Sequence, residues 1–147
     1  MKKTLLLVCV LCFLLPSTAF SQTDFSIRIL AGARAPWGEV QLISIDGKGN
    51  GKHKLTNGRT GDIDSTSFSI SKDELSKLRE ALNTVNFFNL NEGYNTQSVD
   101  GSAMSVSATM AGKSKEVTWF NVQNKETTIL KDRLNGILKK KGITIRY

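Results

Sequence analysis

The first part of the chain alternates apolar and polar residues in short runs, a pattern typical of half-buried β-strands. Residues 25–29 alternate regularly and predict one strand. A second run spans residues 40–45, but its alternation slips by one between Leu42 and Ile43. Either a β-bulge or burial on both faces of the strand would explain this slip.

Turn residues and a polar strand follow this second run. Residues 46–51 are rich in glycine, aspartate and asparagine, which tolerate the positive φ angles of tight turns. They precede a polar strand at residues 52–56, so we predict a β-hairpin. Phe68 and Ile70 predict one more short strand before the first helix.

The first helix has the clearest local signal in the chain. Ser71 and Glu74 have the spacing of a capping box, in which each side chain bonds a free amide group at the start of a helix. An apolar stripe at spacings of three and four predicts an amphipathic helix that ends near Asn86. Phe87 and Phe88 should then anchor the chain to the sheet, ahead of a polar loop. The stripe consists of Leu75, Leu78, Leu82 and Val85.

The second half of the chain predicts another hairpin and another helix. Residues 104–110 alternate, residues 111–114 form a turn, and Trp119 lies on the partner strand, where we expect it in the core. The second helix should end at a lysine triplet and Gly142, which suits a left-handed cap. Its apolar face consists of Ile129, Leu130, Leu134, Ile137 and Leu138. A final strand is predicted from Ile143, Ile145 and Tyr147.

The order of these elements predicts an α+β fold. Strands joined by short hairpins pair antiparallel, and two amphipathic helices can bury their stripes on the same face of the sheet. We therefore expect an antiparallel sheet of about five to seven strands with two helices packed on one face. No internal repeat or proline-rich linker interrupts residues 22–147, so we assign them to a single α+β domain.

The first 21 residues have the layout of a cleavable signal peptide. A positively charged start is followed by an apolar run at residues 5–15 and then by helix-breaking and small residues. Ala19 and Ser21 are small residues suitably placed for a cut before Gln22. The apolar run is shorter than the roughly 20 residues that span a bilayer. We expect residues 1–21 to be removed and the protein to be exported, periplasmic or extracellular, with no transmembrane segment after cleavage.

Cleavage would change the composition in two ways. The two cysteines, Cys9 and Cys12, lie in the signal, so the remaining chain would have no cysteine and no thiolate chemistry. Loss of Lys2 and Lys3 would leave 18 basic and 13 acidic side chains, a net charge of +5. That charge fits weak attraction to anionic surfaces, although a solvated lysine-rich surface explains it more simply. We expect no specific nucleic-acid partner.

Few residues could carry catalysis or hold a metal. His53 is the one histidine and has lysines on both sides, and no Gly-x-Ser-x-Gly nucleophile segment is present to work with it. Asp62 and Asp64 could bind a cation or act as acid and base, but the sequence offers no third ligand beside them. We therefore predict no catalytic residue, no metal site and no cofactor.

The loop of residues 32–38 is the strongest candidate for binding. It joins two strands at an end of the sheet and contains Arg34 and Trp37, residue types that are enriched at binding hot spots. The simpler interpretation is that Trp37 covers the core and Arg34 is solvated. Tyr94, in the polar loop of residues 91–100, is a similar candidate.

The order of these features resembles a group of small exported bacterial domains of unknown function. The pattern is also distantly similar to emfourin, a small inhibitor of thermolysin-like metalloproteases. The resemblance implies the fold and, through emfourin, an inhibitor of a secreted protease. Members of the first group often carry cysteines in the first loop, where this chain has none. The matching positions are Gly38, Asp46-Gly47, Leu78, Phe87-Phe88, Tyr94, Asp100 and the Gly112-Lys113 turn.

Taken together, the sequence favours a non-enzymatic binding module whose partner is a secreted or envelope protein. A small cation-dependent hydrolase that uses His53, Asp62 or Asp64 is the alternative from a different class. A third hypothesis is attachment to anionic polymers or membrane surfaces through the lysines, which would weaken as salt rises.

Overall fold

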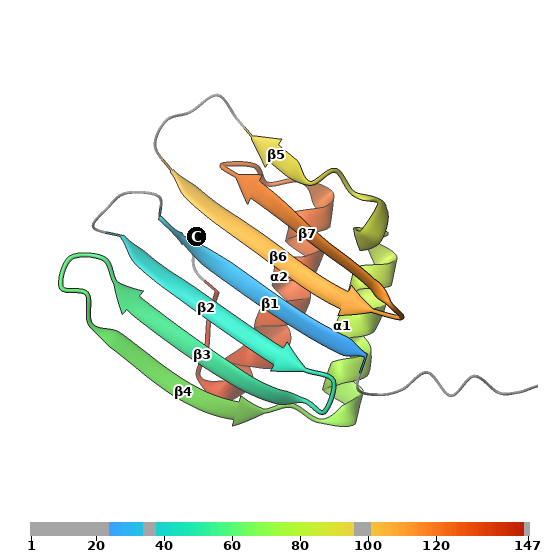
Figure 1. Cartoon of the computed structure of the whole chain (residues 1–147), viewed down its shortest axis with the longest axis horizontal. Helices are drawn as coiled ribbons and strands as arrows, with labels where there is room; N and C mark the ends of the chain where they lie inside the picture. Colours follow the sequence, from blue (N-terminus) through green and yellow to red (C-terminus); the bar gives the residue numbers. More distant parts are fainter. Residues whose placement is uncertain (1–23, 34–37, 96–100, 146–147) are drawn as a thin grey trace, which may run out of the picture.

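A computed structural model describes residues 24–33, 38–95 and 101–145. Strands in this part of the chain form one seven-stranded sheet in the order β4-β3-β2-β1-β6-β7-β5 (Figure 1). Neighbouring strands are antiparallel, except that β5 runs parallel to β7. The strands are β1 (Phe25–Ala33), β2 (Glu39–Asp46), β3 (Asn50–Asn57), β4 (Ile63–Ser69), β5 (Gly93–Asn95), β6 (Ser102–Met110) and β7 (Lys113–Phe120).

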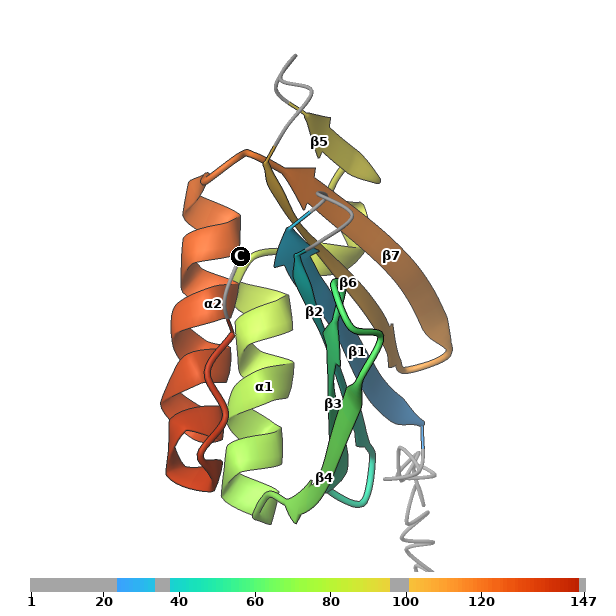
Figure 2. The ribbon, with the colours of Figure 1, turned by 90° about the vertical axis from the view of Figure 1, so that its left-hand side faces the viewer.

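Two helices, α1 (Lys72–Thr84) and α2 (Lys125–Leu138), lie on the same face of the sheet and leave its other face open (Figure 2). A short 3-10 segment follows each of them, η1 (Phe87–Asn89) after α1 and η2 (Lys139–Lys141) after α2. The predicted α+β class, with both helices on one side of the sheet, is confirmed. No helix in the described ranges is long and apolar enough to cross a membrane.

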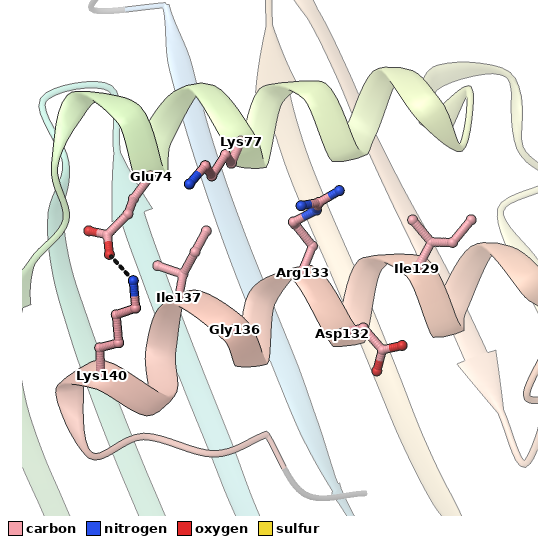
Figure 3. A pocket seen from close by; sticks show the side chains of 8 residues that line it. All are labelled: Glu74, Lys77, Ile129, Asp132, Arg133, Gly136, Ile137 and Lys140. Atoms are coloured by element: carbon pink, nitrogen blue, oxygen red, sulfur yellow. Dashed lines mark ion pairs between the residues drawn. The ribbon is translucent and has the colours of Figure 1, made fainter.

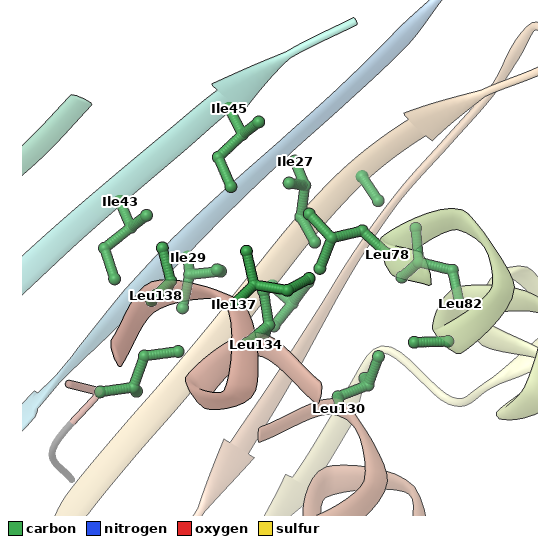
Figure 4. Close-up of a cluster of buried hydrophobic side chains, with 14 of the residues drawn as sticks. Ile27, Ile29, Ile43, Ile45, Leu78, Leu82, Leu130, Leu134, Ile137 and Leu138 are labelled. Carbon is green, nitrogen blue, oxygen red and sulfur yellow. The ribbon is translucent and has the colours of Figure 1, made fainter. Parts of the chain in front are cut away.

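The core lies between the sheet and the helix layer (Figure 4). Alternate side chains of the central strands point toward the helices, as the period of two along a strand requires. Trp119 and Phe87 are fully buried there, which confirms the expected place of Trp119. Each large apolar side chain buried in this way contributes about 1.5–3 kcal/mol to folding. The buried residues labelled in Figure 4 are Ile27, Ile29, Ile43, Ile45, Leu78, Leu82, Leu130, Leu134, Ile137 and Leu138.

Both helices begin at a side-chain cap. Ser71 Oγ accepts a hydrogen bond from the Glu74 N–H (3.2 Å), and Glu74 Oε2 accepts one from the Ser71 N–H (2.9 Å), so the predicted capping box is confirmed. The hydrogen bond from the Ser71 N–H to the Glu74 carboxylate is the main cause that holds the pKa of Glu74 below its ordinary value. Asn124 and Thr127 form the same kind of box at α2. Gly142 has φ 74° and ends η2 in the left-handed conformation that the sequence predicts.

The predicted last strand is wrong for the described part of the chain. The N–H of Ile145 donates to Asn135 Oδ1 of α2 (2.8 Å), and Gln41 Nε2 of β2 donates to the carbonyl oxygen of Thr144 (3.1 Å). After η2 the chain turns back beside α2 in the helix layer (Figure 2). There the side chains of Asn135 and Gln41 make the backbone hydrogen bonds that a neighbouring strand would make in a sheet. Tyr147, which the prediction included, lies outside the described residues.

Strands occupy two segments where the sequence predicts none. β4 begins at Ile63, so it is longer than the short strand expected around Phe68, and Asp64 lies in a strand. The sequence hides β4 because this edge strand is exposed along nearly all of its length and shows no apolar alternation. The polar loop of residues 91–100 contains β5, whose three residues pair with the end of β7.

Candidate functional site

Of the three predicted binding residues, the structure describes only Tyr94, which packs against the core. Arg34 and Trp37 lie outside the described residues. Tyr94 lies in β5, where its ring stacks on the buried Trp119 with centroids 6.0 Å apart and planes 5° from parallel. Tyr94 is half-buried, and its hydroxyl accepts a hydrogen bond from the Asn91 N–H (3.3 Å). Its place in the fold is therefore that of a lid on the core.

The candidate catalytic groups do not combine into a site. His53 lies on the inward side of β3, and its Nε2 is buried with no hydrogen-bond partner among the described residues. Burial lowers the pKa of His53 below its ordinary value of 6.5. Asp62 accepts a hydrogen bond from Thr60 Oγ1 (2.6 Å) within its own turn, and Asp64 is exposed on β4. No group of three or more metal-ligating side chains occurs within residues 24–33, 38–95 and 101–145.

The Asp46 carboxylate is used by the β2–β3 hairpin. It accepts hydrogen bonds from the N–H of Lys48 and from the N–H and side chain of Asn50, each 2.9 Å long. The bond from the Asn50 side chain is the main reason that the pKa of Asp46 is lowered. These bonds fix the turn, and the hairpin predicted for residues 46–51 is confirmed.

A groove of about 420 Å³ separates α1 from α2 (Figure 3). Lys77 and Arg133 point into it from opposite helices, while Asp132 points away from α1. One end is bridged by Lys140 and Glu74, whose charged atoms are 4.0 Å apart. The groove contains no nucleophile beside a base, and exposed ion pairs of this kind contribute at most about 1 kcal/mol. Lys77 and Arg133 could attract an acidic group, but the groove has no geometry that would select a particular ligand.

The open face of the sheet is the larger and more distinctive surface. On its β6–β7 half, the hydroxyl groups bond one another across the strands: Ser105 Oγ lies 2.6 Å from Thr118 Oγ1, and Thr109 Oγ1 lies 2.9 Å from Ser114 Oγ. Ser107 Oγ likewise donates to Glu116 (2.6 Å). This half therefore satisfies most of its own hydrogen-bonding groups.

The other half of the open face, on β1 to β4, carries cations that form no ion pair within the described part of the chain. We call Arg28, Lys52 and Lys54 the basic cluster. Arg28 and Lys52 lie in one row across the sheet, on either side of Ser44, and Lys54 pairs directly with Leu42. None of the three forms an ion pair with another described residue. Their charge is therefore available to a partner.

Apolar side chains lie beside the basic cluster. We call Leu30, Val40, Leu42 and Ile63 the apolar patch. Leu30 and Leu42 are directly opposite each other on β1 and β2, and Ile63 lies in the same row as Val40 with Thr56 between them. Leu30 is 44% exposed and Ile63 is 63% exposed, the large apolar side chains that the described part of the chain leaves most open to water. Exposed apolar residues that gather in one place mark interaction sites.

The sequence contained a signal for this patch. The β1–β2 register is continuous from Ser26 opposite Asp46 to Gly32 opposite Val40, so no bulge explains the slip between Leu42 and Ile43. The other interpretation, apolar residues on both faces of β2, is the correct one. Ile43 is buried in the core and Leu42 lies on the open face.

No protein-family model matches the chain, and no curated protein matches it either.

Proposed function

We propose that this protein is an exported, non-enzymatic binding module, and that a secreted or envelope protein docks on the open face of its sheet. One observation carries the proposal: the exposed large apolar residues, Leu30 and Ile63, both lie on the open face, next to the basic cluster. Export is supported by the signal-peptide pattern of residues 1–21.

The basic cluster and the apolar patch together indicate what the contact surface of the partner is like. Burial of the apolar patch supplies affinity, and the neighbouring cations favour a surface that carries carboxylates. The acidic side chains on the open face have local partners, since Asp46 is bonded to its own turn and Glu116 to Ser107. We therefore propose a partner whose contact surface is apolar at the centre and acidic at one side. Arginine, represented here by Arg28, is one of the residue types enriched at binding hot spots.

A narrower form of the proposal is inhibition of a secreted metalloprotease. Its support is the resemblance to emfourin in the order of turn and core residues. The hydrolase alternative has less support, because His53 faces the helix layer while Asp62 bonds within its own turn. An anionic polymer would use the basic cluster but leave the apolar patch without a role.

The test is affinity capture with immobilised residues 22–147 from the envelope and culture fluid of the source organism. Leu30→Asp serves as the open-face variant, Asn83→Asp on the exposed side of α1 as the matched control, and Arg34→Ala/Trp37→Ala reports on the first loop. We expect one protein to be captured by the wild type and by Asn83→Asp, and to be lost with Leu30→Asp.

Four outcomes would change or narrow the proposal. The same proteins captured by the wild type and Leu30→Asp would remove the open face as the site. Loss with the Arg34→Ala/Trp37→Ala variant alone would move the site to the first loop. A captured thermolysin-like protease that the purified protein inhibits at a one-to-one ratio would support the narrower form. A mature N-terminus other than Gln22 would contradict the cleavage site.

A further inference from the structure

One edge of the sheet is formed by β4, and its outer side is free of other strands among the residues that the structure describes. β4 is paired with β3 in an unbroken register from Asn50 opposite Ser69 to Thr56 opposite Ile63, and no other described strand lies beyond it. The opposite edge is β5, which is only three residues long. A free edge of seven regular residues is long enough to template another strand.

The hydrogen-bond pattern identifies which residues of β4 face outward. The Asn57 N–H donates to the carbonyl oxygen of Asp62 (2.9 Å), and the Ile70 N–H donates to that of Gly49 (2.9 Å). In an antiparallel pair, residues that bond the neighbouring strand alternate with residues whose N–H and C=O point away from it. Even-numbered residues of β4 therefore bond β3, and the backbone groups of the odd-numbered residues point to the free edge. Those residues are Ile63, Ser65, Ser67 and Ser69.

The same odd-numbered residues place their side chains on the open face. Ser65 pairs with Lys54 and Ser67 pairs with Lys52, so each lysine of the basic cluster has a serine between it and the free edge. Strands lie about 4.8 Å apart, so an added strand would lie about 10 Å from β3. Serine is short enough for a lysine side chain to extend across it toward that strand. Ile63 offers an apolar neighbour at the start of the same edge.

β4 has few of the features that protect edge strands from pairing. It contains no lysine, no proline and no bulge, and its one charged residue is Asp64, whose side chain lies on the other face. Natural proteins usually block an edge of this length, so a free edge beside the exposed Lys52 and the half-buried Lys54 points to a use for it.

We propose that β4 binds an extended segment of the partner by strand addition. In that segment an apolar side chain lies opposite Ile63 and acidic side chains lie opposite Ser65 and Ser67, within reach of Lys54 and Lys52. The main-chain hydrogen bonds supply affinity, and the lysines select the acidic residues. This inference rests on the proposed function and specifies how the partner is held at the border of the open face.

A second copy of this chain fits the edge less well. Antiparallel pairing of two β4 strands would place serines opposite serines or Ile63 and would offer no carboxylate to either lysine pair. It would also direct the lysines of the two copies toward each other across the new pair of strands, which is electrostatically unfavourable. An acidic segment removes that repulsion, and for this reason we assign the edge to it.

The experiment uses residues 22–147 and synthetic peptides. The probe is the acetylated, amidated heptapeptide Thr-Glu-Thr-Glu-Thr-Ile-Thr, which has the proposed pattern in antiparallel pairing, and its reversed sequence tests parallel pairing. A probe with lysine in place of each glutamate is the matched control. Amide hydrogen exchange is followed by NMR. Saturating acidic probe should slow exchange at Ile63, Ser65 and Ser67 at least tenfold, while Asp64 and Thr66, already bonded to β3, should change far less.

Variants separate the backbone from the charges. Ser65→Pro removes an N–H that points outward and leaves the bonds to β3, so it should weaken probe binding at least tenfold, whereas Ser65→Ala should bind within about twofold of the wild type. Lys52→Gln/Lys54→Gln should abolish the preference for the acidic probe over the lysine probe. Exchange in the wild-type protein does not depend on how well any variant folds.

The outcomes distinguish this inference from the proposed function. If the acidic probe at millimolar concentration gives no alternating protection, strand addition is overturned. Capture of the partner by Ser65→Pro and not by Leu30→Asp is a separate result. It would support the proposed function and overturn strand addition. Alternating protection that grows with protein concentration in the absence of probe would assign the edge to a second copy and overturn the peptide proposal.

Discussion

The contact between Gly51 and Phe68 gives the sharpest test of how β4 is held to the sheet. These residues are opposite each other on β3 and β4, and the Phe68 ring lies where a side chain at position 51 would be. A Cβ on Gly51 would overlap Cε2 and Cζ of that ring and come within 2.7 Å of Cδ2. Gly51→Ala must therefore displace the ring.

The size of the effect follows from two opposing terms. Gly51 has no positive φ, so alanine fits its backbone, and alanine in place of a strand glycine contributes about 0.5–1 kcal/mol of stability. Forcing a methyl group into an occupied site costs about 1–3 kcal/mol. We expect Gly51→Ala to lower the free energy of unfolding by about 1–2 kcal/mol. With Phe68→Ala already present, the same change should be neutral or stabilising.

The assay is urea unfolding of the wild type, both single variants and the double variant, which form a double-mutant cycle. With a slope of about 1–3 kcal/mol/M, the single variant should shift the midpoint by roughly 1 M. The coupling between the two sites should be about 2 kcal/mol, within the range measured for residues in contact. A Gly51→Ala effect that is equal in both backgrounds would refute the reasoning, since the ring would then not occupy the site.

Three further predictions concern capping, pH and the open face. Ser71→Ala removes the oxygen that caps α1 and should lower the free energy of unfolding by about 0.5–2 kcal/mol in urea titrations, and an unchanged midpoint would contradict the capping role. Stability should fall as pH decreases through 6.5, because the unfolded chain binds a proton that the buried His53 resists in the folded state; the loss should stop below the lowered folded pKa, and His53→Gln should remove this part of the profile. NMR titration of this one histidine checks the shift directly, and a folded pKa at or above 6.5 would refute it. Leu30→Asp should change the free energy of unfolding by no more than about 0.5 kcal/mol, whereas Ile29→Asp should prevent folding; comparable loss from both would mean that Leu30 is part of the core.

Local patterns determined the parts of the fold that depend on neighbouring residues. The capping box at Ser71 fixes the start of α1, because both of its hydrogen bonds lie within one helical turn. The turn before Asn50 closes through bonds to Asp46 only four residues away. Helical and strand periodicities likewise assigned the core, since the side chains of one face recur at a fixed spacing.

Tertiary structure decided how those elements meet. β1 pairs with β6, far along the chain, so β4 remains at the edge of the sheet. Both helices pack on the face that buries Ile43, which leaves Leu42 on the uncovered face. Tyr94 packs at the edge of the core only because β5 pairs with β7, which places its ring against Trp119. Ile145 alternates like a strand residue, yet α2 supplies its hydrogen bond. Long-range pairing sets which strand is an edge and which face is covered, and no local pattern contains that information.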